Sequence, residues 1–167
     1  MTDDKQARDE LPPLTIDLTV ALTRPATIKA YQYWLSLKGG RAMPTRADIT
    51  PAALREVLPQ IALVDVPRPG EPSTAYVTRL AGDAIQRVFG PITGRPLNEI
   101  VAPELLPRWI RSFEAARNAA APVRVASRVS FQKKTWLQAE VLFAPLGEGG
   151  DITTLFAAID IWPADEA

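Results

Sequence analysis

Two arginines and an aspartate lie close together in one short stretch, GGRAMPTRADITP at residues 39–51. The guanidinium groups of Arg41 and Arg46 present planar sets of N–H donors that suit a carboxylate or a phosphate. Asp48 suggests a structural alternative, because it can pair with an arginine or cap the backbone next to Thr50. The stretch is therefore either an anion-binding site or a connector, and the Asp-x-Thr-Pro order favours the connector.

Other charged residues that could do chemistry are spread along the chain. Arg79 stands in the middle of a strand-like run, where it can point either to a pocket or to solvent. Two carboxylates among Asp65, Asp83 and Glu99 could serve as an acid and a base. Their places beside predicted turns favour helix caps or surface charge instead.

The charge of the chain is balanced, with 19 basic and 19 acidic residues. A neutral domain gives no electrostatic basis for binding nucleic acid or an anionic membrane. Arg108, Arg111 and Arg117 lie three or four residues from Glu104 or Glu114, which is typical of ion pairs on a solvated helix. We therefore expect neither nucleic acid nor a membrane as a partner.

Histidine and cysteine are both absent from the sequence. The chain thus lacks the usual general base, the commonest ligand of zinc, copper and haem, and any thiolate. We expect no metal site and no enzyme activity, since any enzyme would depend on Asp, Glu, Lys, Tyr, Ser or Thr. No signal-peptide pattern and no apolar run of about 18 residues is found, so a cytoplasmic location is expected.

The pattern of apolar residues, prolines and glycines predicts one domain at residues 25–163. A flexible segment rich in charge and proline precedes it at residues 1–24, and a tail of residues 164–167 follows. Helices are predicted at 25–38, 51–58, 83–89 and 104–120, and strands at 61–66, 75–82, 122–131, 135–146 and 152–162.

The last two predicted strands carry large apolar side chains on both faces. Trp136 and Leu142 in the first, and Phe156 and Trp162 in the second, share a face with polar residues. The first predicted helix is also apolar on more than one side, and Trp34 lies on it. Because exposed apolar patches usually mark an interface, these five residues are predicted to be covered by that helix, by a second subunit, or by both.

The order of the elements, together with three stretches of sequence, resembles a PAS domain. RLAGDAIQRVFGPITGRPLNEIVAPE at residues 79–104 is similar to the part of a PAS domain in which a strand gives way to short helices. Its matching residues are Gly82, Phe89, Gly90, Gly94, Arg95 and Leu97. YWLSLKGGRAMPTRADITP at 33–51 and LPQIALVDV at 58–66 resemble the opening of a bacterial subfamily of small stand-alone PAS proteins. Matching residues there are Trp34, Gly40, Arg41, Pro44, Arg46, Asp48, Pro51, Leu58 and Pro59. The resemblance extends from about Tyr31 to Trp162.

The resemblance implies an α+β fold, with a five-stranded antiparallel sheet, helices on one face and an additional N-terminal helix. Ligands of PAS domains lie between those helices and the sheet. Trp109 and Phe113, which helical spacing assigns to the core, would therefore adjoin the cavity. The predicted ligand-binding residues are Arg41, Arg46, Asp48, Arg79, Trp109 and Phe113.

The resemblance also implies a sensory or signalling domain that acts through a small-molecule ligand, through protein association, or through both. No output module is recognised in the sequence, so the expected partners are an unidentified signalling protein and a second copy of the chain in a homodimer. Without His or Cys, neither haem nor a cysteinyl-flavin adduct is expected, and the cofactor is unknown. Two alternatives stay open: a small NTF2-like α+β enzyme using Asp or Tyr, and a ligand-free interaction module.

Overall fold

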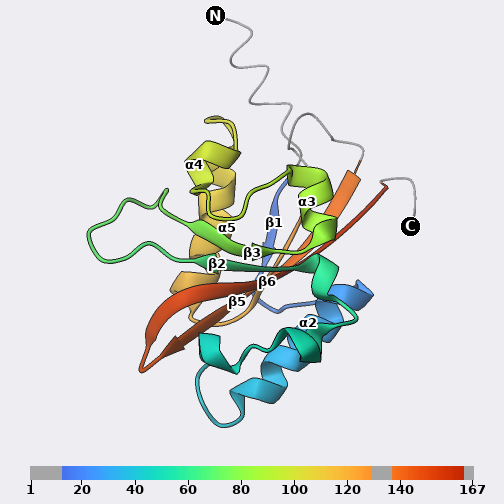
Figure 1. The fold of residues 1–167 in the computed structure, drawn as a ribbon, viewed down its shortest axis with the longest axis vertical. Helices are drawn as coiled ribbons and strands as arrows, with labels where there is room; N and C mark the ends of the chain where they lie inside the picture. Colours follow the sequence, from blue (N-terminus) through green and yellow to red (C-terminus); the bar gives the residue numbers. More distant parts are fainter. Residues whose placement is uncertain (1–12, 129–136, 164–167) are drawn as a thin grey trace, which may run out of the picture.

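A computed structural model describes residues 13–128 and 137–163, and one antiparallel sheet lies at its centre (Figure 1). The strands in spatial order are β1 (Thr15–Asp17), β4 (Val123–Arg128), β5 (Leu137–Glu148), β6 (Asp151–Pro163), β2 (Ile61–Asp65) and β3 (Val77–Ala81). The two longest strands, β5 and β6, form a hairpin that turns at Gly149 and Gly150. Both glycines have positive φ, as the tight turns that match strand twist require.

The sheet has one strand more than the five expected. β1 pairs antiparallel with β4, with Ile16 opposite Val125, and so continues the sheet at its β4 edge. The run LTIDLTVAL at residues 14–22 suggests a short extended or partner-docking segment, and Thr15–Asp17 within it form β1. The sequence places this run in the flexible segment 1–24, because three residues of alternation do not show that a strand joins the sheet.

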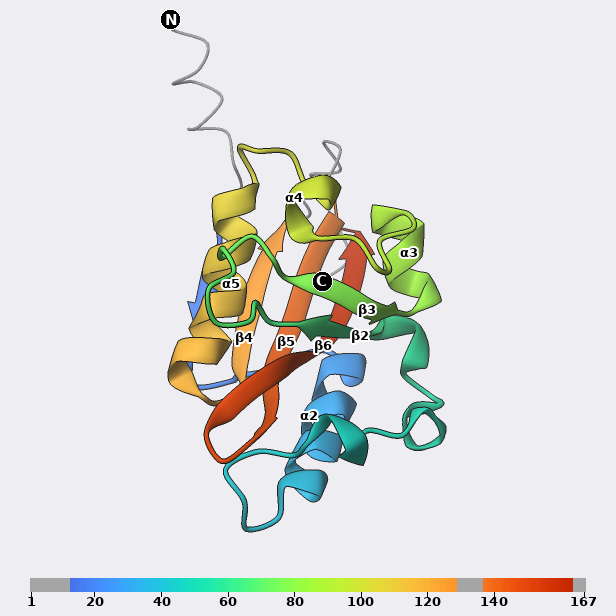
Figure 2. The same ribbon diagram turned by 60° about the vertical axis from the view of Figure 1, so that its left-hand side comes forward.

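Helices cover both faces of the sheet (Figures 1 and 2). The face covered by α2 (Pro25–Lys38) is called the α2 face. The opposite face, covered by α3 (Asp83–Phe89), α4 (Leu97–Ile100) and α5 (Leu106–Ala119), is called the α5 face. None of the helices in the described ranges combines the length and apolar character needed to cross a bilayer.

Three short 3₁₀ turns connect α2 to β2. They are formed by Arg46–Asp48, Pro51–Leu54 and Leu58–Gln60. The single helix predicted at residues 51–58 is therefore wrong. The proline at position 59 has no N–H and clashes with the preceding turn, so the segment before it is too short for a regular helix to become established.

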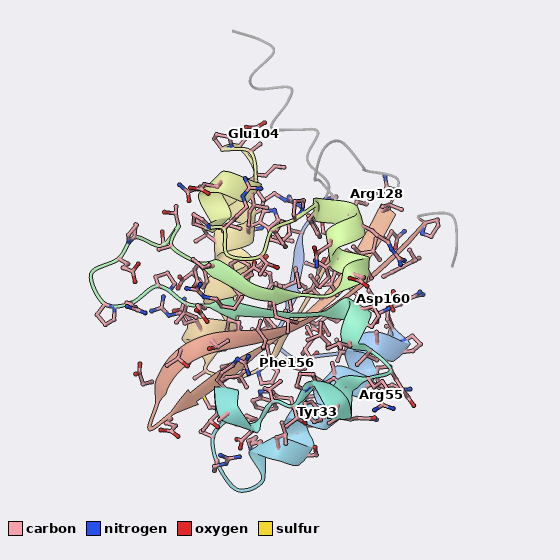
Figure 3. All side chains as sticks on the ribbon, in the orientation of Figure 1. Tyr33, Arg55, Glu104, Arg128, Phe156 and Asp160 are labelled. Atoms are coloured by element: carbon pink, nitrogen blue, oxygen red, sulfur yellow. The ribbon has the colours of Figure 1, made fainter. Side chains whose placement is uncertain are left out.

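The α2 face is an internal core. Trp34 is 2 % exposed, and Leu142 and Phe156 are fully buried beneath α2. The indole Nε1 of Trp34 donates a hydrogen bond of 3.0 Å to the carbonyl oxygen of Pro145 in β5. Tyr33 faces the same core, with its ring centroid 6.2 Å from that of Phe156 (Figure 3). The chain's own helix thus covers these three predicted interface residues.

The other two residues of the predicted interface differ from these three. Trp162 is half-buried near the end of β6, and the guanidinium of Arg24 lies 4.2 Å from the centroid of its ring. This cation–π contact covers part of the Trp162 ring with a residue of the same chain. Trp136 lies outside the described residues.

A buried carboxylate in β5 anchors α2 to the sheet. Glu140 is fully buried, and it accepts hydrogen bonds from the start of α2 and from β4. The donors are Thr23 N (3.0 and 3.1 Å), Thr23 Oγ1 (2.8 Å), Arg24 N (2.9 Å), Thr27 Oγ1 (2.6 Å) and Arg124 Nε (2.8 Å). A helix N-terminus has unpaired N–H groups and a positive dipole end. Because α2 has no side-chain cap of its own, the carboxylate of Glu140 in β5 caps it from the sheet.

These contacts keep Glu140 ionised. Burial raises the pKa of the carboxyl group, but hydrogen bonds from Thr27, Arg124 and Thr23 outweigh it and lower the pKa to about 2. The folded protein therefore stabilises the ionised form of Glu140 relative to the protonated form.

The connector after α2 is held by Asp48. Its Oδ2 atom accepts a 2.8 Å hydrogen bond from the backbone N–H of Thr45 and another, also 2.8 Å, from Nη2 of Arg41. The same Arg41 nitrogen donates to the carbonyl oxygen of Leu37 at the end of α2. These contacts, the backbone hydrogen bond from Thr45 first and that from Arg41 second, lower the pKa of Asp48. Asp48 therefore ties the end of α2 to the first 3₁₀ turn, which is the connector role.

Replacing Glu140 by glutamine should destabilise the fold. Glutamine keeps the shape of the side chain but removes its charge, so the donors around it lose their ionic acceptor. We expect Glu140→Gln to lower the free energy of unfolding at pH 7 by about 3 kcal/mol, the scale of a broken buried ion pair. Urea unfolding followed by circular dichroism measures this loss.

The effect should also depend on pH in one direction. The folded pKa of about 2 lies below the ordinary value of 4.5, so the stabilisation is fully present above pH 4.5. It is lost as the pH falls through 2. The difference in free energy of unfolding between the wild type and Glu140→Gln should therefore become smaller as the pH falls from 4.5 to about 2. Glu148→Gln, at the exposed end of the same strand, is the matched control. A gap that stays constant with pH would contradict this role of Glu140.

Replacing Asp48 by alanine should loosen the connector. We expect Asp48→Ala to lower the melting temperature by about 2–4 °C, because one cap and one ion pair are lost together. Arg46→Ala is the control, since the Arg46 side chain is exposed and makes no hydrogen bond or ion pair with the described residues. Differential scanning fluorimetry gives both values. Equal melting temperatures for Asp48→Ala and the wild type would favour the anion-binding interpretation.

Candidate functional site

A cavity of about 70 Å³ lies between α5 and the sheet on the α5 face. Its apolar wall is formed by Phe89, Trp109, Val125, Val141, Phe143 and Ile159. Because successive residues of a strand point to opposite faces, Val141 and Phe143 reach this cavity while Leu142 between them lies under α2. The same strand therefore serves the helix anchor on one side and the cavity on the other.

A second cavity, of about 40 Å³, lies deeper in the same apolar interior. It borders Ile85 and Leu97, and it shares Phe89, Trp109 and Phe143 with the first cavity. The two spaces are therefore separated mainly by aromatic side chains.

The aromatic side chains link the helices to one another and to the sheet. Phe89 of α3 meets Trp109 of α5 edge-on, with ring centroids 5.4 Å apart, and Phe113 lies 5.0 Å from Phe143 of β5. Trp109 and Phe113 are themselves 6.2 Å apart. Such edge-to-face pairs add to the stabilisation from burial alone. Trp109 and Phe113, predicted as ligand-binding residues, thus lie in one wall together with Phe89.

A polar group closes the far end of this wall. The phenol of Tyr76, which is 1 % exposed, donates a 2.6 Å hydrogen bond to Oε1 of Glu114, and Arg117 lies 3.5 Å from that oxygen. Burial and the hydrogen bond to Glu114 raise the pKa of Tyr76. The phenol is therefore a fixed donor rather than a candidate base.

Arg108 also lines the 70 Å³ cavity, although the sequence analysis did not place it there. Its Nη2 atom donates a 2.9 Å hydrogen bond to Oγ of Ser127 across the mouth of the 70 Å³ cavity. No ion pair joins Arg108 to any carboxylate within the described part of the chain. Burial, and then the charge of Arg111, lower the pKa of Arg108.

The expected solvated ion pair is therefore wrong for Arg108. Helix spacing brings acidic residues within reach, but the side chain turns toward β4 instead. One signal in the sequence points this way: Ser112, one turn later, interrupts the apolar face of α5 and lines the same cavity.

The remaining predicted ligand-binding residues lie away from this cavity. Arg79 is exposed on β3, and its Nε atom lies 2.6 Å from Oδ2 of Asp65 on β2. Arg41, Arg46 and Asp48 belong to the connector beside α2, on the opposite side of the sheet. The structure thus brings Trp109 and Phe113 together but places none of the four charged residues at this cavity; Arg41 and Asp48 contact each other in the connector instead.

Two of the carboxylates considered as an acid–base pair, Asp65 and Asp83, have structural roles. Asp65 is paired with Arg79, and Asp83 is exposed in the first turn of α3, where a negative charge suits the helix dipole. Among the residues whose positions are described, no group of three acidic side chains gathers closely enough to hold a metal ion.

Comparison with known proteins agrees with this architecture. A family model described as a PAS domain matches residues 22–159, which is most of the chain. No curated protein matches the sequence significantly. The matched range includes strands β2–β5, most of β6, and the helices α2–α5 that cover them. The chain therefore belongs to the PAS domain family.

Proposed function

We propose that this PAS domain is a sensor that holds a small molecule between α5 and the sheet and passes its state to a signalling protein. The observation that carries the proposal is the apolar cavity bordered by Phe89, Trp109 and Phe143. An apolar pocket with a few polar groups at its mouth is the usual form of a small-molecule site. Arg108 and Ser127 supply those polar groups here.

The aromatic wall gives the proposed sensor a means of response. Phe89 lies on α3 and Trp109 on α5, so a molecule that separates their rings changes the packing of both helices. A ligand shifts an equilibrium only if it binds one packing more tightly than another. The two helices would then present a different surface to the partner protein.

The small volume of the cavities favours a second candidate function. Cavities of about 70 and 40 Å³ are below the range of about 300–1,000 Å³ that is usual for ligand pockets. A ligand of that size therefore requires Trp109 to move. If Trp109 does not move, the domain is a ligand-free interaction module with a filled core. Both candidates use no catalytic group, and a cytoplasmic location is expected for both.

Filling the cavity separates the two candidates. Ala139 on β5 lines the cavity, and Ala139→Leu should occupy it without changing the fold. In a thermal-shift screen of metabolites, we expect a binding compound at 100 times its Kd to stabilise the wild type by about 2.7 kcal/mol. The same compound should not shift Ala139→Leu.

The control for this screen is Ala119→Leu, which adds the same side chain at the exposed end of α5. It should respond as the wild type does. Native mass spectrometry of the protein purified without added ligand gives an independent measurement. If no compound shifts the wild type and no bound mass is detected, the interaction module is the better description.

We also propose a homodimer, and its surface must differ from the buried residues of the α2 face. Leu18, 65 % exposed, and Leu35, 45 % exposed, are the large apolar side chains most exposed in the described ranges. Leu18 follows β1, which is an edge strand, and strand edges are ready templates for pairing with a second chain. Pairing of two β1 edges would bury Leu18.

Light scattering after size exclusion tests the dimer. We expect a mass of twice 18.2 kDa for the wild type and for Leu35→Lys, and a single-chain mass for Leu18→Lys. A charged side chain at an apolar contact disfavours association because it must be desolvated. A wild type of single-chain mass at 100 µM would refute the dimer, and dissociation of Leu35→Lys alone would move the interface to α2.

A further inference from the structure

We propose that the cavity on the α5 face takes a small monocarboxylate with an apolar tail. The carboxylate would bind Arg108 and Ser127 at the mouth, and the tail would lie against Trp109. This inference rests on the proposed sensor function and names the class of its ligand. It begins from the charge at the mouth of the cavity.

Arg108, the cation at the mouth, has N–H donors left to bind an anion. A guanidinium carries five N–H donors, and the hydrogen bond from Arg108 to the neutral hydroxyl of Ser127 uses one of them. Arg108 is half-buried, so water compensates its charge only in part. Carboxylates match the planar fork of arginine with two parallel hydrogen bonds.

The other residues around the cavity increase this preference for an anion. Arg128, the last described residue of β4, is exposed and also borders the cavity. No aspartate or glutamate is among the described lining residues, whereas the chain as a whole has equal numbers of acidic and basic residues. The cavity is therefore a local site of positive charge in a neutral protein, and it favours anions over cations.

The remainder of the wall decides what kind of anion fits. Beyond Arg108, Arg128, Ser112 and Ser127, every lining residue in the described ranges is apolar, so we expect the body of the ligand to be apolar too. A phosphate or a dicarboxylate would require further polar partners deep in the cavity, since buried polar groups need hydrogen bonds. A ligand with a single carboxylate at the mouth places no unpaired polar group deep in the cavity.

The cavity volume limits the length of the tail. A volume of about 70 Å³ admits on the order of two water-sized groups at about 30 Å³ each. A longer tail must displace Trp109 toward the 40 Å³ cavity behind it. Tail length thus links occupancy to the Phe89–Trp109 contact, on which the proposed response depends.

The test compares acids with uncharged analogues of the same shape. Butanoate, hexanoate and octanoate, with the corresponding amides, are titrated into the full-length protein at constant ionic strength. Binding is followed by ¹H–¹⁵N NMR shifts of β5 and α5. We expect at least one acid to bind the wild type tenfold or more tightly than its amide does. Displacement of Trp109 should appear as a shift of its indole N–H signal.

Two variants of Arg108 test whether this residue causes the preference for the acid. Arg108→Gln keeps a hydrogen-bonding side chain without charge and should weaken binding of the acid at least tenfold, while Arg108→Lys should retain part of it. Arg111→Gln is the matched control, because Arg111 lies three residues further along α5 and is exposed; it should bind as the wild type does. Comparison of acid and amide on the wild type remains decisive if a variant fails to fold.

The outcomes distinguish this inference from the proposed function. If amides bind as tightly as acids, or if Arg108→Gln binds as the wild type does, the cavity takes ligands but the carboxylate is refuted. If neither series binds while another compound shifts the wild type and not Ala139→Leu, the sensor stands and the ligand class is wrong. If no compound binds at all, both are refuted.

Discussion

The ionised carboxylate of Glu140 is the interaction on which the two-sided architecture depends. A buried charge is strongly unfavourable unless it is paired and hydrogen-bonded, and here backbone, hydroxyl and guanidinium donors surround it. Apart from the Arg124 guanidinium of β4, those donors come from the start of α2, so most of the charge compensation is present only while the helix is in place. In return, α2 covers an apolar sheet face that includes Leu142 and Phe156. Charge compensation and apolar burial thus require the same helix position.

This anchoring leaves the opposite face of the same strands to the cavity. Glu140 points toward α2, whereas its neighbours Ala139 and Val141 line the space beneath α5. Alternation along a strand thus joins a rigid polar anchor to a loosely filled apolar site. Glu140 holds β5 on the other side, so in the proposed sensor we expect a change in occupancy to alter the packing of the helices, where Trp109 and Phe89 meet. The sheet would then be the fixed reference for α3 and α5.

Local features were predictable from the sequence, and distant pairings were not. Proline at the start and glycine after the end mark α2 at its observed residues, 25–38, and the helical spacing of Trp109 and Phe113 correctly assigns them to one wall. The PAS resemblance is confirmed by the family match. By contrast, LTIDLTVAL suggests an extended segment but does not show that β1 pairs with β4. Glu140 and Arg108 have ordinary positions in an apolar strand and a charged helix, and their roles depend on partners 113 and 19 residues away.

The distance along the chain between Glu140 and its partners also matters during synthesis. Thr23 lies 117 residues before Glu140, and Thr27 lies 113 residues before it. A ribosome therefore makes α2 early, but neither its cap nor the sheet face that buries Trp34 exists until the β5–β6 hairpin has emerged. During that interval the apolar side of α2 has no native partner, and such exposed surfaces are where aggregation begins. Among the described helices, α2 is thus translated before the others but is among the last to acquire its native contacts.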